Sequence, residues 1–139
     1  MSGAKPDSFW AGGFLYHAPA RSILLHKRDG NTKASPNKWA FFGGHNEGAE
    51  SHIECFIREM KEEIGLVVRA EDARPLCEYM DVWSNRYRVV YYIEAYVPVE
   101  RLVLGEGAGL AWHSLDEVDN LDLSDRTRDD MKIFRQKIG

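Results

Sequence analysis

The alternation of apolar and polar residues at the start of the chain predicts β-strands. Residues 8–16 and 22–27 are short, apolar and rich in aromatic or branched side chains, and the Ala-Pro-Ala-Arg segment between them is typical of a turn. Residues 29–37 collect Gly, Asn, Ser and Pro and are predicted to form a loop. Residues 39–42 then predict a short strand that runs into a Gly43-Gly44 loop. These segments open a β-sheet.

A helical period of apolar residues follows that loop. Ser51 and Glu54 form a capping box in front of it, and Gly65 ends it, so a helix with boundaries near residues 52 and 64 is predicted. The apolar positions on one face of this helix are Ile53, Phe56, Ile57, Met60 and Ile64.

The second half of the chain also contains strand-like and helix-like patterns of apolar residues. Residues 76–83 and 87–97 bracket residues 84–86 as in a hairpin, and residues 110–113 predict a further short strand. From Ser124 onward Met131, Phe134 and Ile138 recur at helical spacing, with Asp early and Lys and Arg late, which predicts a terminal helix. The order of strands and helices predicts an α/β fold with a mixed sheet covered by helices, in a single domain over residues 1–139.

Composition and charge restrict the function and the location. The net charge of −4 argues against a stable nucleic-acid partner, because such binding depends mainly on Lys and Arg, and an anionic substrate would need local cations. Cys55 and Cys77 are the only cysteines, and Cys55 falls in the predicted helix, so a disulfide framework is not expected. The apolar runs are shorter than a membrane span, and no basic segment followed by an apolar one begins the chain. These features predict a cytoplasmic location.

Acidic residues cluster on the first predicted helix. Glu59, Glu62 and Glu63 lie at i, i+3 and i+4, so a helix makes them neighbours, at a cost of a few tenths of a kcal/mol for each like-charged pair. A charge run of this kind is usually a solvated helix face. Here the apolar side fixes the helix against the core, and carboxylates grouped on a rigid element suit Mg²⁺, which also binds substrate phosphates.

The residues around this cluster resemble the Nudix hydrolase family. The segment from Gly44 through Glu50 and Arg58 to Leu66 matches the Nudix box, G-x5-E-x7-R-E-U-x-E-E-x-G-U with U aliphatic, at every defined position. The resemblance implies an α/β/α sandwich with a mixed sheet between helices, and water attack on a bridging diphosphate with Mg²⁺, for which Mn²⁺ can substitute. Two departures, Phe42 where Pro is frequent and Gly48-Ala49 where Pro-Gly is frequent, bring loop geometry into question but not the chemistry.

The resemblance also assigns roles to single residues. It implies metal ligands at Glu59, Glu62 and Glu63, with the Gly43 carbonyl as a further ligand. It implies that Arg58 orients Glu59 and that Glu50 assists from the loop, whereas a surface partnership of Arg58 with Glu54 or Glu62 is the alternative. Glu59, Glu62, Glu50 and Arg58 are therefore the predicted catalytic residues. Gly43 and Gly44 let the backbone approach the phosphates without a side-chain clash.

Candidates outside the box carry weaker signals. Glu106, before Gly107 and the strand with Trp112, is the predicted second catalytic carboxylate, against the alternative of a solvated loop residue. Glu94 is the second choice, and in an alternating strand it could face solvent. Lys27 and Arg28 end a strand and are candidates for phosphate binding, although paired basic residues there are more often a solvated edge.

The predicted activity is cleavage of a phosphoanhydride bond in a nucleoside diphosphate linked to another group, such as a nucleoside triphosphate, oxidised or not, or a nucleotide sugar. The alternative is a non-catalytic nucleotide-binding or sensor domain of the same fold, which would not need all three box carboxylates. An RNA-end hydrolase is disfavoured by the negative charge and the lack of a basic tract. The family resemblance is compatible with a homodimer. Candidates for stacking on a base are Phe9, Trp10, Trp39, Tyr79, Trp83, Tyr87 and Trp112.

Overall fold

A computed structural model of the chain describes residues 8–31, 36–105 and 108–139. The described part contains a mixed sheet of seven strands in which β3, β2, β1, β6 and β5 lie in that order, while β4 pairs with β1 and β7 pairs with β2. The pairing of β1 with β6 is parallel and the other pairings are antiparallel. The strands are β1 (Phe9–His17), β2 (Ser22–Lys27), β3 (Trp39–Ala40), β4 (Phe42–His45), β5 (Arg74–Asp81), β6 (Arg86–Glu94) and β7 (Gly109–Ser114).

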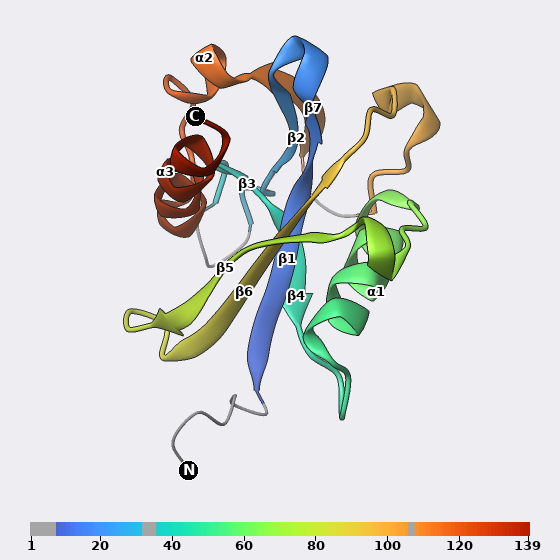
Figure 1. The fold of residues 1–139 in the computed structure, drawn as a ribbon, viewed down its shortest axis with the longest axis vertical. Coiled ribbons are helices and arrows are strands. Elements are labelled where there is room, and N and C mark those ends of the chain that lie inside the picture. Colours follow the sequence, from blue (N-terminus) through green and yellow to red (C-terminus); the bar gives the residue numbers. More distant parts are fainter. Residues whose placement is uncertain (1–7, 32–35, 106–107) are drawn as a thin grey trace.

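Helices cover both faces of this sheet. Figure 1 shows α1 and α3 on opposite sides of the central strands, with the short α2 near one end. The α-helices are α1 (His52–Ile64), α2 (Leu115–Val118) and α3 (Asp125–Ile138), and 3₁₀ turns are η1 (Ala18–Ala20), η2 (Ala70–Asp72) and η3 (Val99–Arg101). The predicted α/β fold with a mixed sheet between helices is confirmed.

Residues next to each other in the strands supply the two halves of the core. Phe14 packs in the cluster with Phe134 of α3, whereas its neighbour Leu15 packs in the cluster with Phe56 and Met60 of α1. This division follows from the strand period of two, which sends successive side chains to opposite faces. A strand buried on both faces reads as a continuous apolar run, which explains the sequence of β1.

Most predicted elements agree with the structure, but the segment before the box does not. Residues 39–42 are not one strand, because β3 ends at Ala40 and β4 begins at Phe42. The prediction of a Gly43-Gly44 loop is wrong as well: both residues lie in β4, where Gly43 pairs with Gly12 and Gly44 with Ala11 of β1. A Cβ atom on Gly12 would lie 2.0 Å from the Phe42 carbonyl oxygen, so glycine is needed where these two strands approach closely.

The boundaries of the β5–β6 hairpin also differ from the predicted ones. Its strands end at Asp81 and resume at Arg86, so the turn holds residues 82–85 and begins earlier than predicted. Asn85 takes a left-handed conformation with φ of 57°, which a turn Asn tolerates. The second strand ends at Glu94 and does not reach Val97.

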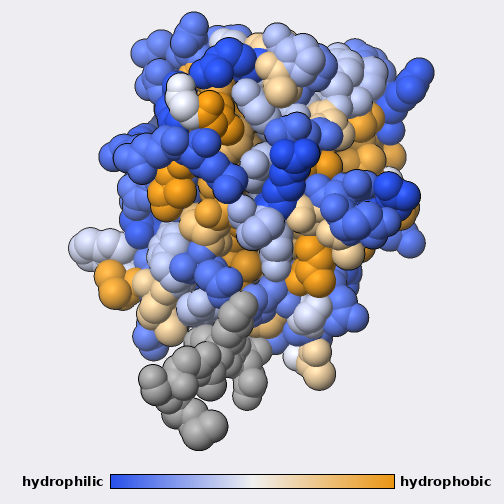
Figure 2. Space-filling view, viewed as in Figure 1, coloured by the Kyte–Doolittle hydropathy of each residue, from blue (hydrophilic) through white to orange (hydrophobic). Residues whose placement is uncertain are grey.

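The surface in Figure 2 is mostly hydrophilic, with hydrophobic residues in separated groups. Among the helices of the described residues, none is long and apolar enough to cross a membrane. The cytoplasmic location stays a prediction. Cys55 and Cys77 are free thiols.

Candidate active site

Helix α1 positions the predicted carboxylates. Its N-cap Ser51 accepts a hydrogen bond from the Glu54 N–H, and the Glu54 side chain accepts one from the Ser51 N–H, while Gly65 ends the helix in a left-handed conformation. Phe56 and Met60 are fully buried on the opposite face. The helix is therefore held at both ends and along one side, and its carboxylates keep a fixed direction.

Strand β4 brings two glycines against these carboxylates. The Gly43 N–H donates a hydrogen bond of 2.7 Å to Glu63 Oε2. A Cβ atom on Gly44 would lie 2.3 Å from Glu59 Oε2, so only glycine leaves that carboxylate its present place. Within strand β4, Gly43 thus donates a hydrogen bond to one acidic side chain, and Gly44 leaves room for another.

The three box carboxylates share one cavity of about 460 Å³. We call it the carboxylate cavity, and its lining residues are Gly43, Gly44, His45, Glu59, Glu62, Glu63 and Gly105. Gly105 lies against the end of α1, because its N–H donates a bond of 2.7 Å to the Glu63 carbonyl. The strand, the helix and the loop after η3 therefore all contribute to the walls.

Arg58 joins the acidic side chains next to this cavity. Its Nε donates to Glu50 Oε2 at 2.6 Å, its Nη2 donates to Glu50 Oε1 at 3.1 Å, and its Nη1 donates to Glu62 Oε2 at 3.0 Å. Nη1 also lies 3.6 Å from Glu59 Oε2. Arg58 therefore contacts Glu59, but its two-point hydrogen bond is made to Glu50, and the role of orienting Glu59 stays a prediction.

The Arg58–Glu50 pair is stabilised in its ionised form. The hydrogen bond from Arg58 lowers the pKa of Glu50, and the bond to Glu50 raises the pKa of Arg58. Cys55, which lies close to both, behaves differently because burial raises its pKa to about 12. Its thiol stays protonated near neutral pH and is a poor nucleophile.

The donor set of the carboxylate cavity suits a hard divalent cation. Its charged donors are carboxylate oxygens, which Mg²⁺ and Mn²⁺ prefer, and the Gly44 position leaves room that a side chain would fill. Among the described residues, no group of three or more acidic, His or Cys side chains is arranged so that it could hold a metal ion by itself. An open arrangement fits a cation that uses few protein carboxylates and completes its shell with water and substrate phosphates.

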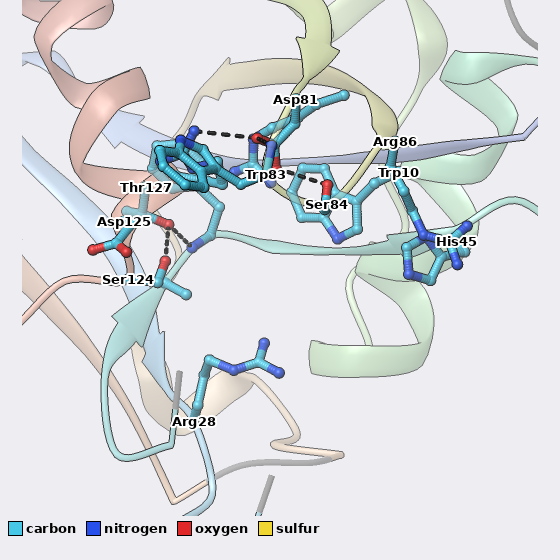
Figure 3. A pocket seen from close by; sticks show the side chains of 14 residues that line it. Trp10, Arg28, His45, Asp81, Trp83, Ser84, Arg86, Ser124, Asp125 and Thr127 are labelled. Carbon is cyan, nitrogen blue, oxygen red and sulfur yellow. Dashed lines mark hydrogen bonds and ion pairs between the residues drawn. The ribbon is translucent and has the colours of Figure 1, made fainter. Parts of the chain in front are cut away.

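Two larger cavities continue from the carboxylate cavity. The central cavity, of about 660 Å³, is lined by Trp10, His26, Arg28, Asp29, Asn31, Gly43, Gly44, His45, Glu63 and Gly105. The tryptophan cavity, of about 680 Å³, is lined by Trp10, Arg28, Ala40, Phe41, His45, Asp81, Trp83, Ser84, Arg86, Arg88, Ser124, Asp125, Arg126 and Thr127. Figure 3 shows residues of the tryptophan cavity, which come from β1, β3, β4, β5, β6 and the β5–β6 turn, from the segment after β2 and from the start of α3. The shared residues make the three cavities one path.

The path includes residues for which the sequence predicts no role. His45 lines all three cavities, and burial lowers its pKa, so its imidazole is neutral near pH 7. Its place directly after Gly43-Gly44 is the only local signal. Asp81, Asp125 and Arg126 are brought to the tryptophan cavity by tertiary packing, which no local pattern announces.

The remaining predicted residues divide into three groups. Arg28 lines the central and tryptophan cavities, whereas Lys27 lines none of the three. Glu94 forms an ion pair of 3.1 Å with Arg74 on the sheet surface and does not line the path. Glu106 lies outside the described residues, so its role stays a prediction.

Comparison with known proteins adds a family match. The sequence matches the model of the NUDIX domain over residues 11–136. It is 26% identical over 117 residues to the nucleoside triphosphatase NudI of Enterobacter sp. (strain 638), an alignment that covers 77% of this chain and 83% of that protein.

Solved structures share the fold. A mutT/nudix family protein from Listeria innocua superposes with a TM-score of 0.75 at 22% identity, covering 97% of this chain and 96% of that one. A bifunctional NMN adenylyltransferase/ADP ribose pyrophosphatase from Francisella tularensis, complexed with AMP and a Mn ion, superposes with a TM-score of 0.74 at 18% identity, covering 99% of this chain and 44% of that one.

Proposed function

Because this chain belongs to the Nudix domain family, we propose that it hydrolyses a phosphoanhydride bond in a nucleoside diphosphate linked to another group, with Mg²⁺ as cofactor. The family match and the nucleoside triphosphatase relative confirm the predicted family and the predicted enzyme class, a Nudix pyrophosphohydrolase. The observation that carries the more specific proposal is the convergence of Glu59, Glu62 and Glu63 on one cavity with Gly43 and Gly44.

We assign the metal to these three carboxylates. A divalent cation bound there would neutralise the diphosphate and polarise its phosphorus. The Gly43 carbonyl remains a candidate for a further ligand. The Gly43 N–H holds Glu63 at 2.7 Å, and Gly44 leaves space for Glu59, so the chain places two of the three acidic groups without a metal.

Arg58 and Glu50 act as positioning residues in this proposal. The two-point bond between them fixes the guanidinium, which then reaches Glu62 at 3.0 Å and Glu59 at 3.6 Å. Glu50 is a poor proton acceptor, because Arg58 holds its pKa below the ordinary value. The proton of the attacking water therefore goes to Glu59 or Glu62, or to Glu106 as predicted from the sequence.

In the proposed reaction one P–O bond forms and one P–O bond breaks. A water oxygen forms a bond to one phosphorus, the bond from that phosphorus to the bridging oxygen breaks, and the leaving phosphate carries away the electron pair. The carboxylate that takes the water proton activates the nucleophile. The neutral His45, which lines the same cavity, can donate a hydrogen bond to a phosphate oxygen without adding charge.

Two observations on other proteins support the substrate and the cofactor. The Enterobacter relative is named a nucleoside triphosphatase, and the Francisella structure holds AMP and a Mn ion. We therefore favour nucleoside triphosphates among the substrates, with nucleotide sugars next, and Mn²⁺ as a substitute for Mg²⁺. The single domain over 1–139, the homodimer and the absence of a stable nucleic-acid partner stay predictions.

The test is product release from a panel of nucleoside triphosphates, oxidised triphosphates, nucleotide sugars, ADP-ribose and dinucleoside polyphosphates. Each is incubated with Mg²⁺, with Mn²⁺ and with chelator, and the products are separated by chromatography. We expect metal-dependent cleavage of one class. Binding without cleavage throughout the panel would contradict the proposal and favour the non-catalytic alternative.

A further inference from the structure

The turn between β5 and β6 presents a large aromatic side chain to solvent. Trp83 is 83% exposed, although an indole is among the side chains that proteins most often bury in part. In Figure 1 this turn extends from the lower left of the molecule, away from the two core layers. Tryptophan is one of the residue types that are enriched at binding surfaces.

The turn itself is held in one conformation. The Asp81 carboxylate accepts a bond of 3.2 Å from the Trp83 N–H and one of 2.7 Å from the Ser84 hydroxyl. The same carboxylate pairs with Arg126 at the start of α3, at 3.2 Å. Asp81 is only 5% exposed, so it is a buried anchor for an exposed turn. The backbone that carries the indole is thus tied to a helix on the other side of the cavity.

Trp83 lines the end of the path that lies away from the carboxylates. The tryptophan cavity shares Trp10, Arg28 and His45 with the central cavity, and the central cavity shares Gly43, Gly44 and Glu63 with the carboxylate cavity. A molecule whose diphosphate lies at the carboxylates would therefore extend toward Trp83. Figure 3 shows Trp83 beside Asp81 and Ser84 in this cavity.

The lining at this end suits a flat ring joined to an anion. Four of its side chains are arginines, in a protein whose net charge is −4, while Asp125 supplies a hydrogen-bond acceptor. Trp10 is not an equivalent stacking surface, because Arg88 lies over its ring at 3.9 Å from the centroid. Within the described residues, no cation lies over the Trp83 ring in this way. Its exposed indole is therefore open to stacking by a ligand ring.

We propose that the Trp83 indole is the stacking surface for the base of the nucleotide substrate and determines how tightly that base is bound. This inference rests on the proposed function, because it takes the diphosphate to lie at the carboxylate cavity. Stacking on an aromatic side chain tolerates different bases, since each base has a π-face. Trp83 therefore contributes affinity for nucleotides as a class, and the acceptor Asp125 is left to select among bases.

The experiment measures binding without turnover. The four common nucleoside 5′-monophosphates and ribose 5-phosphate, which has no base, are titrated by calorimetry into the wild type, Trp83→Ala, Trp83→Phe and Val82→Ala, in chelator. Val82 is the matched control, because it is 81% exposed in the same turn and does not line the cavity. KM and kcat are then measured with Mg²⁺ on the cleaved substrate.

We expect Trp83→Ala to weaken monophosphate binding and to raise KM by about 10-fold or more. Trp83→Phe should retain most of the affinity, Val82→Ala all of it, and ribose 5-phosphate should bind all four proteins alike. Unchanged monophosphate affinity and KM in Trp83→Ala would overturn the inference. So would an equal loss for ribose 5-phosphate, which would make the turn a structural element only.

Two further outcomes separate this inference from the proposed function. Trp83-dependent nucleotide binding with no cleavage of any panel compound would retain the stacking role and remove the hydrolase proposal. Normal cleavage with an unchanged KM in Trp83→Ala would do the reverse. Sedimentation of the same variants tests the other use of an exposed indole: a dimer that dissociates in Trp83→Ala while KM stays constant would overturn the inference.

Discussion

Two arginine–carboxylate networks lie on opposite sides of the sheet, and they differ in what surrounds them. On the α1 side, Arg58 contacts several carboxylates, whose side chains range from 12% exposed at Glu59 to 54% exposed at Glu62. On the α3 side, Arg88 pairs with Asp130 at 2.8 Å, and that carboxylate, which also accepts a bond of 2.7 Å from Tyr79, is fully buried. The same chemical pair thus occurs once at a cavity wall and once in the interior.

The difference in burial separates two uses of one interaction. A half-exposed carboxylate can exchange its partner for a metal or water at little cost, because solvent screens whatever charge is left alone. A buried pair cannot, because the loss of one partner leaves a charge without solvent or a counter-ion. The α1 network is therefore suited to chemistry, and the α3 network to fixing the helix against the sheet.

The largest effect that this comparison predicts is a loss of turnover without a loss of stability. Glu62→Gln, and separately Glu63→Gln, should lower kcat by about 10³-fold, because each removes a charge placed to stabilise the transition state. The free energy of unfolding should stay constant or rise by a few tenths of a kcal/mol, since like charges on α1 are relieved. Steady-state kinetics and urea unfolding measure the two quantities.

The control for these variants is Lys61→Gln, which changes an exposed residue of the same helix that does not line the carboxylate cavity. Its kcat should match the wild type. If Glu62→Gln and Glu63→Gln both turned over at the wild-type rate, the α1 carboxylates would have no part in the reaction.

The opposite result is expected from the buried network. Asp130→Asn keeps the shape of the side chain but leaves Arg88 without its counter-ion, which should cost about 3–5 kcal/mol of unfolding free energy. Asp129→Asn changes the neighbouring residue, whose half-exposed carboxylate pairs with Arg126, and should cost less than about 1 kcal/mol. Equal losses in the two variants, measured by urea unfolding, would mean that burial does not separate the networks.

A glycine variant tests whether the position of the α1 carboxylates matters as much as their charge. In Gly44→Ala the added Cβ would lie 2.3 Å from Glu59 Oε2, and the flexible side chain would shift to relieve the clash. A displacement near 1 Å should lower kcat by about 10²-fold, with little loss of stability.

Gly109→Ala is the matched control, because its Cβ would make ordinary contacts at 3.7 Å and more. Kinetics and circular dichroism on both variants separate displacement from unfolding. A wild-type kcat in Gly44→Ala would show that the place of Glu59 is not critical.

The two networks also differ in how far the sequence could predict them. The α1 network is local, since helical spacing brings Arg58, Glu59, Glu62 and Glu63 together, and a capping box and a terminal glycine fix the boundaries that the structure confirms. The bond between Arg88 and Asp130 joins residues 42 positions apart. No periodic pattern encodes that pairing, which arises only when α3 packs against β6.

The same reasoning explains the errors. The prediction of a loop at Gly43-Gly44 followed from the usual meaning of paired glycines, but the pairing with Gly12 of β1 is a contact between distant segments. The tryptophan cavity could not be predicted from the sequence for the same reason, because its walls come from the beginning, middle and end of the chain. The helix and most of the strands could be predicted, and the pockets between them could not.

The smallest effect predicted concerns His26, a buried group that has no carboxylate partner recorded in the described residues. Its Nε2 lies 3.0 Å from the Phe41 carbonyl oxygen, and burial lowers its pKa to about 4. In the unfolded chain this imidazole takes up a proton near pH 6.5, whereas in the folded chain it does so only near pH 4. The contribution of neutral His26 to the free energy of unfolding is therefore fully present above pH 6.5 and is lost as the pH falls from 6.5 to 4. The loss should reach about 2 kcal/mol at pH 5 relative to pH 7.5. In His26→Gln the difference between urea unfolding at these two pH values should shrink by that amount, whereas His17→Gln, at the half-buried end of β1, should keep it. If His26→Gln kept the full difference, the acid sensitivity would come from other groups whose pKa is lowered in the folded chain, namely the rings of His45 and His113 or carboxylates such as Glu50 beside Arg58.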